Sequence, residues 1–186
     1  MLMLSTAIAL FAVVQILALA PAPRRHLERL FGRAFTTLHI LATLLLGTLV
    51  LVAWSYAPAV RLYEPGPFGR IAAFMAIAAA SLLAGISLFR GSLRLKLRFP
   101  LILALAFFSL GHILADGNLA SLVLFGGMLA LTTALLILGL LAGRRPEPEI
   151  RPGHDLLSLL SGLALFAAMA QLHPVITGVP VLTLSR

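Results

Sequence analysis

Apolar residues occur in six long runs along the chain, each bounded by charged residues or by Pro and Gly. The runs cover residues 3–20, 36–57, 71–89, 99–115, 119–142 and 156–173. None holds Lys or Arg in its interior, and each approaches or reaches the about 17–25 residues that a helix needs to cross a bilayer. An alternation with period two, typical of transmembrane barrel strands, is not visible. The pattern predicts an all-α fold, an integral membrane bundle of six transmembrane helices forming a single domain over residues 1–186.

Composition strengthens the membrane prediction. Hydrophobic residues make up 61% of the chain, and the mean hydropathy is +1.07, whereas soluble domains are about 45–50% apolar. A soluble enzyme and a soluble nucleic-acid-binding domain are therefore excluded. Cysteine is absent, which excludes disulfides, thiolate metal ligands and a Cys nucleophile.

The net charge of +8 predicts how the chain crosses the membrane. Eleven of the 14 basic residues fall in the first, third and fifth loops: Arg24, Arg25, Arg29, Arg33, Arg90, Arg94, Lys96, Arg98, Arg144, Arg145 and Arg151. The positive-inside rule places these loops in the cytoplasm, with a retained first helix and both termini on the outer, periplasmic side of a bacterial inner membrane. Topology and attraction to anionic headgroups of the lipid bilayer explain the charge, so no nucleic-acid partner is expected.

Ionisable residues inside a membrane are costly and usually face the bundle interior or water. Ser109, His112 and Asp116 share one face of the fourth run. A carboxylate one turn from an imidazole can orient it or raise its pKa, which makes His112 the strongest candidate for a site. Asp116 and Asn118 also flank a glycine, and all three residues are turn formers, so a tight turn outside the membrane is the alternative.

Two further histidines lie within or at the end of apolar runs. His173 and His112 are both near the outer ends of their helices and could meet at one depth. His39 is near the inner end of its run, where Gln15 of the first run lies at similar depth, so we expect these two side chains to hydrogen-bond. The remaining histidines are expected to be solvated loop residues: His26 and His154.

No motif of hydrolytic or phosphate chemistry is found. The sequence lacks a phosphate-binding Gly loop, an HExxH pair and a Ser-His-acid arrangement in usable context. Imidazole in apolar surroundings suits haem iron, for which His is a common axial ligand. The candidate metal ligands are His112 and His173.

One stretch of the chain resembles a known family. It reads Arg98-Phe99-Pro100, then Gly-His-Ile-Leu-Ala-Asp-Gly-Asn-Leu-Ala-Ser over residues 111–121, then Leu-Phe-Gly-Gly over residues 124–127. This resembles the signature of the NnrU family of multi-pass membrane proteins. Weaker similarity covers residues 24–43, His173-Pro174 and the segment 178–180.

The resemblance implies a function. Bacterial members of the family are associated with denitrification, and the plant and cyanobacterial relative is 15-cis-zeta-carotene isomerase, a haem b membrane enzyme. By position, His112 matches an axial haem ligand of that isomerase. Phe99 stands where the family has His, and Gln15 matches the position of the other ligand. The resemblance therefore leaves His173 or His39 as the second ligand.

Three functions stay open at this point. The first is binding of haem b or of a hydrophobic small molecule, polyene or quinone-like, with redox-gated isomerase-like chemistry; around the ligand histidines, the supporting residues would be Asp116, Asn118, Ser109, Gln15 and Arg98. The second is an accessory or assembly factor with a denitrification or respiratory enzyme as partner. The third is a small transporter or proton relay, although the chain has no internal repeat.

Overall fold

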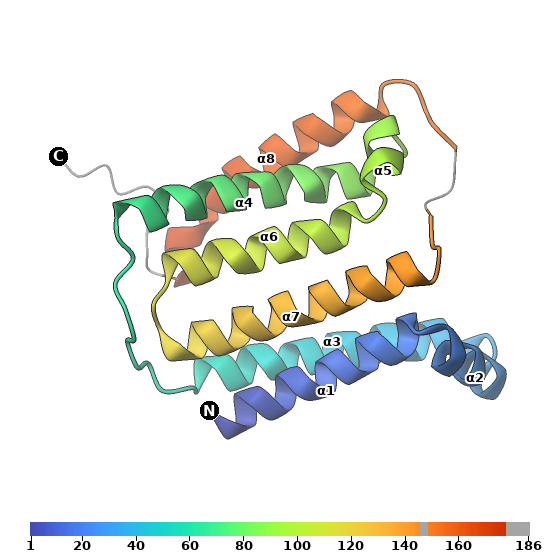
Figure 1. The fold of residues 1–186 in the computed structure, drawn as a ribbon, viewed down its shortest axis with the longest axis horizontal. Coiled ribbons are helices and arrows are strands. Elements are labelled where there is room, and N and C mark those ends of the chain that lie inside the picture. Colours follow the sequence, from blue (N-terminus) through green and yellow to red (C-terminus); the bar gives the residue numbers. More distant parts are fainter. Residues whose placement is uncertain (146–148, 178–186) are drawn as a thin grey trace. The chain divides into compact units, whose positions relative to one another are not determined.

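The computed structural model describes residues 1–145 and 149–177, and their regular structure is helical (Figure 1). The helices are α1 (Leu2–Leu19), α2 (Pro21–Phe31), α3 (Ala34–Ser55), α4 (Pro67–Leu88), α5 (Ser92–Leu97), α6 (Pro100–Ala115), α7 (Leu119–Leu141) and α8 (His154–Thr177). The all-α prediction is confirmed. The segment 178–180, part of the family resemblance, lies outside the described residues.

Five of the described helices are long and apolar enough to cross a membrane: α1, α3, α4, α7 and α8. The predicted span 99–115 forms the shorter helix α6, of 16 residues. At about 1.5 Å per residue, α6 is about 24 Å long, against an apolar bilayer thickness of about 30 Å. Pro100 at its first residue and the turn after Ala115 limit its length. The prediction of six spans therefore holds in part, with five supported by length and composition.

The first loop between the predicted spans contains a helix of its own, α2. Ala20 is extended, with ψ of 129°, because a residue before proline avoids the helical region. Pro21 then begins α2, a position that needs no amide hydrogen. The helix ends at Gly32, whose φ of 54° is readily adopted only by glycine. The two ends of α2 are thus encoded by Pro21 and Gly32.

Helix α8 also differs from its prediction. The expected span ended at His173, but the helix continues to Thr177 with Pro174 inside it. Proline lacks an amide hydrogen, so the carbonyl four residues earlier, that of Ala170, loses its helical partner. His173 is therefore a residue of the last helical turns and does not terminate the helix.

The chain forms two compact units, which we describe separately. The first unit comprises Met1–Pro65 and Ala115–Arg144 and contains α1, α2, α3 and α7. The second unit comprises Gly66–Leu114 and Arg145–Arg186 and contains α4, α5, α6 and α8. Each unit is therefore built from two separate stretches of the sequence.

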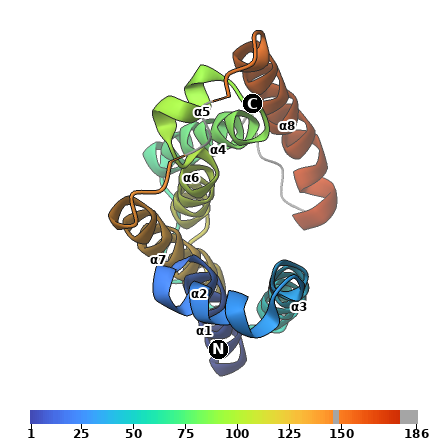
Figure 2. The same ribbon diagram turned by 90° about the vertical axis from the view of Figure 1, so that its right-hand side faces the viewer.

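In the first unit, α1 packs against both α3 and α7 (Figures 1 and 2). The side chains at their contact form an apolar core: Leu4, Ala7, Val50, Ala53, Ala120 and Leu124. Outside this core, large apolar side chains point away from the protein, and Leu45 is 71% exposed. A face of this kind is stable in lipid, where no hydrophobic cost attaches to exposed leucine.

In the second unit, α4 and α8 approach closely because both carry glycine at their contact. A Cβ atom at Gly85 would lie 2.3 Å from the backbone oxygen of Ser158 and 2.6 Å from the backbone nitrogen of Gly162. A Cβ atom at Gly162 would lie 2.7 Å from the Cα of Leu82. Small residues at helix contacts replace the hydrophobic drive that lipid does not provide. Backbone-to-backbone packing therefore joins these two helices.

Candidate functional site

His112 lies in the last turn of α6, one turn after Phe108. Its Nδ1 is 2.9 Å from the backbone oxygen of Phe108, and the Phe108 ring contacts the imidazole at a centroid distance of 4.2 Å. A carbonyl oxygen only accepts hydrogen bonds, so Nδ1 carries the hydrogen and Nε2 carries the lone pair of the neutral ring. This is the arrangement in which metal-binding histidines are usually held.

The second unit brings His173 of α8 next to His112. The two ring centroids are 6.5 Å apart, and the ring planes are inclined by 42°. Two imidazoles bound on opposite sides of one metal, at about 2 Å from metal to nitrogen, have centroids about 6 Å apart. The observed spacing is therefore short enough for both imidazoles to contact one bound group.

The donor set also bears on which metal group would fit. Within the described residues, no three His, Cys, Asp or Glu side chains gather around one point. A bare ion at His112 and His173 would have two protein ligands, whereas haem brings four ring nitrogens of its own. The chemistry of the pair thus suits haem better than a free metal ion.

The position of α6 against α4 is fixed close to His112. A Cβ atom at Gly111 would lie 2.7 Å from Cδ1 of Ile77 and 3.2 Å from the backbone oxygen of Ala73, so the two helices approach closely at this glycine. Ser109 is fully buried and donates a hydrogen bond of 2.8 Å to the backbone oxygen of Leu105. Its hydroxyl is thus satisfied within the helix. Ser109 supports the packing of α6, and nothing in its contacts ties it to a ligand.

Asp116, which the sequence predicts to support His112, begins a turn in the first unit. Its Oδ1 accepts a 3.0 Å hydrogen bond from the amide of Asn118. The Oδ1 of Asn118 caps α7 by accepting from the amide of Ala120 at 2.9 Å. The alternative interpretation of this segment, a tight turn after the helix, is confirmed, and the backbone oxygen of Phe108 orients His112.

The glycine of this turn joins α7 to the segment after α3. The backbone oxygen of Gly117 accepts hydrogen bonds from the amides of Leu62, at 2.8 Å, and Tyr63, at 3.4 Å. The amide of Leu119 donates to the oxygen of Val60 at 2.8 Å. A Cβ atom at Gly117 would lie 1.8 Å from the backbone oxygen of Tyr63. The Asp-Gly-Asn part of the motif is therefore a structural clasp.

Gln15 and His39 both belong to the first unit. The amide of Gln15 donates a 3.0 Å hydrogen bond to the hydroxyl of Thr43, one turn beyond the expected partner. His39 stacks on Phe35 of its own helix at a centroid distance of 6.2 Å. The interhelical hydrogen bond of Gln15 was thus predicted, but with the wrong partner.

Arg98 connects α5 to α6. It is the residue after α5 and has a φ of 60°, and its guanidinium carbon lies 5.3 Å from the centroid of the Phe99 ring. An arginine over an aromatic face gains a cation–π attraction. These contacts indicate that Arg98 fixes the turn of the chain between the end of α5 and the start of α6 at Pro100.

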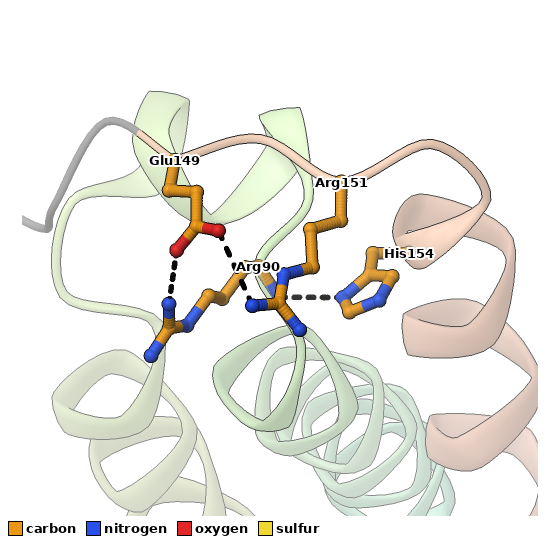
Figure 3. A network of polar contacts seen from close by, with 4 residues as sticks. All are labelled: Arg90, Glu149, Arg151 and His154. Atoms are coloured by element: carbon orange, nitrogen blue, oxygen red, sulfur yellow. Dashed lines mark hydrogen bonds and ion pairs between the residues drawn. The ribbon is translucent and has the colours of Figure 1, made fainter.

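A polar network that the sequence did not predict lies at one end of the second unit (Figure 3). Glu149 accepts from Arg151 at 3.2 Å and pairs with Arg90. The amide of Arg90 donates to Nδ1 of His154 at 3.1 Å, a contact in addition to the solvation expected for this histidine. The hydrogen bonds from Arg151 and then Arg90 lower the pKa of Glu149 below its ordinary value.

Asp155 extends this network to α5. Its two carboxylate oxygens accept from the hydroxyl of Ser92 at 2.5 Å and from the amide of Leu93 at 3.0 Å. A Cβ atom at Gly91 would lie 2.0 Å from Oδ1 of Asp155. Asp155, in the first turn of α8, thereby accepts hydrogen bonds from the first two residues of α5 and caps that helix. The network fixes helix ends and contains no arrangement of general acid and base.

Comparison with protein families decides the identity. The family model described as NnrU protein matches residues 3–181, nearly the whole chain. The chain belongs to the NnrU family. Searches of curated proteins and of solved structures gave no match. Together with the five long apolar helices, the family places this NnrU chain among multi-pass membrane proteins.

Proposed function

We propose that this NnrU-family protein binds haem b, which His112 and His173 would hold through their imidazoles. The observation that carries the proposal is the 6.5 Å spacing of the two imidazoles. The hydrogen bond from Nδ1 of His112 to Phe108 supports it, because metal-binding histidines are usually oriented by such a bond from their other ring nitrogen. The family resemblance, in which His112 matches a ligand position, is independent of this geometry.

Aromatic side chains of the second unit supply apolar surface: one lies against His112, and two others pack on each other between α4 and α8. Phe108 packs on His112, and Phe74 and Phe166 meet edge to face with centroids 5.3 Å apart in the same unit. Apolar walls exclude water and raise the strength of the remaining polar contacts. When bound, haem supplies one-electron redox chemistry at iron. An apolar ligand, polyene or quinone-like, would reach the site from the lipid, and the reaction class would be the redox-gated isomerisation that the resemblance implies.

The first test is an absorption spectrum of the full chain purified in detergent, before and after loading with haem b. We expect a Soret band and the low-spin spectrum of an iron with two imidazole ligands. His112→Ala should lose the band. His173→Ala should keep bound haem but show a high-spin, five-coordinate spectrum. A wild-type protein that stays colourless after loading would overturn the proposal.

A matched control separates the two possible second ligands. His39→Ala removes an imidazole from an apolar helix without touching the pair in the second unit, so its spectrum should equal that of the wild type. Loss of the low-spin spectrum in His39→Ala, with His173→Ala unaffected, would contradict the assignment of His173. Adding free imidazole to His173→Gly should restore the low-spin spectrum in the fraction in which haem still co-elutes with the folded protein on size-exclusion chromatography.

A further inference from the structure

Helix α2 has two chemically different sides. Pro23, Leu27 and Leu30 recur at spacings of four and three, which places them on one side. The opposite side carries the charged residues of the helix: Arg24, Arg25, Glu28 and Arg29. Apolar side chains near the end of α2 are exposed, with Leu30 at 66% and Phe31 at 44%. The helix is therefore amphipathic, unlike the uniformly apolar spans.

The position of α2 is that of a helix at a membrane surface. It connects the end of α1 at Leu19 to the start of α3 at Ala34 and runs across the ends of these two helices (Figure 2). Because α1 and α3 are candidate membrane spans, a helix lying across their ends lies at the boundary of lipid and water. Amphipathic helices with arginine on the polar side occupy this boundary.

The charged side of α2 carries an excess of positive charge around a hollow. Glu28 is paired with Arg24 at 2.7 Å, so its charge is neutralised within the helix. Within the described residues, Arg25 and Arg29 have no acidic partner. Both line a shallow hollow of about 620 Å³, together with Ala22 and Glu28. Nε of Arg29 donates to the backbone oxygen of Arg25, at 3.3 Å. A hollow flanked by two guanidinium groups without an acidic partner attracts an anion with several oxygen atoms.

We infer that α2 binds the headgroups of anionic phospholipids in the cytoplasmic leaflet. Leu30 and Phe31 lie among the upper acyl chains, and Arg25 and Arg29 hold a lipid phosphate at the hollow. Guanidinium groups bind phosphate through paired hydrogen bonds. The cytoplasmic leaflet is the one that carries negative surface charge, and the positive-inside rule assigns this end of the first unit to that leaflet. The inference does not depend on haem binding.

The main test measures lipid binding to the full chain in detergent by native mass spectrometry, with phosphatidylglycerol and phosphatidylcholine as probes. Phosphatidylglycerol should bind more tightly. Each of Arg25→Gln and Arg29→Gln should weaken that binding about fivefold, the effect of about 1 kcal/mol per basic residue. Arg61→Gln is the control, because Arg61 is exposed, pairs with Glu64 and lies in another loop.

Three outcomes would overturn the inference. Equal binding of the two lipids by the wild type would exclude a headgroup site. An equal loss in Arg61→Gln and Arg25→Gln would show that only overall charge matters. Displacement of the lipid by millimolar inorganic phosphate would indicate a site for a soluble anion instead of a membrane lipid.

A second test locates α2 relative to the bilayer and uses the absence of cysteine from the sequence. Spin labels at Leu30→Cys and Ala22→Cys are placed singly in the full chain in phosphatidylglycerol-containing nanodiscs. The label at position 30 should be accessible to oxygen, which concentrates in lipid. The label at position 22 should be accessible to a water-soluble nickel complex. A water-accessible label at both positions would contradict the membrane placement of α2.

Discussion

In this NnrU-family protein, the helices of the first unit pack on one another in a different way from the helices of the second unit. In the first unit, apolar side chains such as Leu4 and Leu124 fill the contact between helices. In the second unit, glycine lets the backbones of α4 and α8 approach directly. Direct backbone contact leaves little freedom for one helix to shift along the other. The unit with the tighter helix contact is also the one that pairs the two imidazoles.

This difference indicates that the two units have different roles. The proposed ligands His112 and His173 would have to be held within fractions of an ångström, and the close contact with α4 fixes α8, the helix that carries His173. The first unit instead carries the amphipathic helix α2 and the clasp at Gly117. Accordingly, mutations at helix contacts should have unequal effects in the two units.

The largest effect is expected for Gly85→Ala. The added Cβ would meet backbone atoms of Ser158 and Gly162, which cannot rotate away as a side chain can. We expect the free energy of unfolding to fall by about 3 kcal/mol, the upper end of overpacking costs. The measurement is an unfolding titration in mixed detergent micelles. In haem-loaded protein the low-spin spectrum should weaken as well, because α8 carries His173.

Gly47→Ala is the matched control in the first unit. The nearest atom to its added Cβ is Cε2 of Phe11 at 3.8 Å, an ordinary contact. Replacing glycine by alanine inside a helix is otherwise stabilising by about 0.5–1 kcal/mol. The variant should therefore be as stable as the wild type or slightly more. Equal destabilisation by both changes would remove the contrast between the units.

A smaller effect is expected from the hydrogen bond between Gln15 and Thr43. Such bonds between membrane helices contribute about 0.6 kcal/mol on average. A double-mutant cycle with Gln15→Leu and Thr43→Val should give a coupling energy near this value, measured by the same unfolding titration. A coupling of several kcal/mol would show that the first unit depends on a polar contact and not on its apolar core.

The smallest effect concerns Glu149, which is exposed. Because Arg151 and Arg90 lower its pKa, its contribution to stability is present at neutral pH and is lost as the pH falls through the lowered pKa. The thermal midpoint of the wild type should exceed that of Glu149→Gln slightly at neutral pH, and the two should converge in acid. A difference that stays constant on acidification would contradict this role of the carboxylate.

The helices themselves could be predicted from the sequence because apolar runs and their breaks are local signals. Pro100 and Asn118 mark the starts of α6 and α7 as expected from their chemistry. Helix α2 was missed because its high charge was taken as a loop signal. The available indication of a helix was the spacing of Arg24 and Glu28, because opposite charges four residues apart can pair on a helix. The structure shows this pair.

The contacts of individual side chains were less predictable. The expectation that His112 and His173 lie at one depth followed from residue counting, and the structure places their rings 6.5 Å apart. The hydrogen bond of His112 to the backbone of its own helix at Phe108 was not anticipated, since sequence spacing drew attention to side-chain partners only. The partner of His154, the amide of Arg90, is 64 residues away, and no local pattern indicates it.

The interleaving of the two units has a consequence for biosynthesis. The chain passes between units after Pro65, Leu114 and Arg144, so the ribosome has made α4, α5 and α6 before α7 emerges to complete the first unit. Helices α1 and α3 are therefore synthesised before α7, the helix that completes their contact. Three of the four helices of the second unit are made in between. Translation of the gene as two fragments, cut at any single loop, would leave at least one unit divided between them.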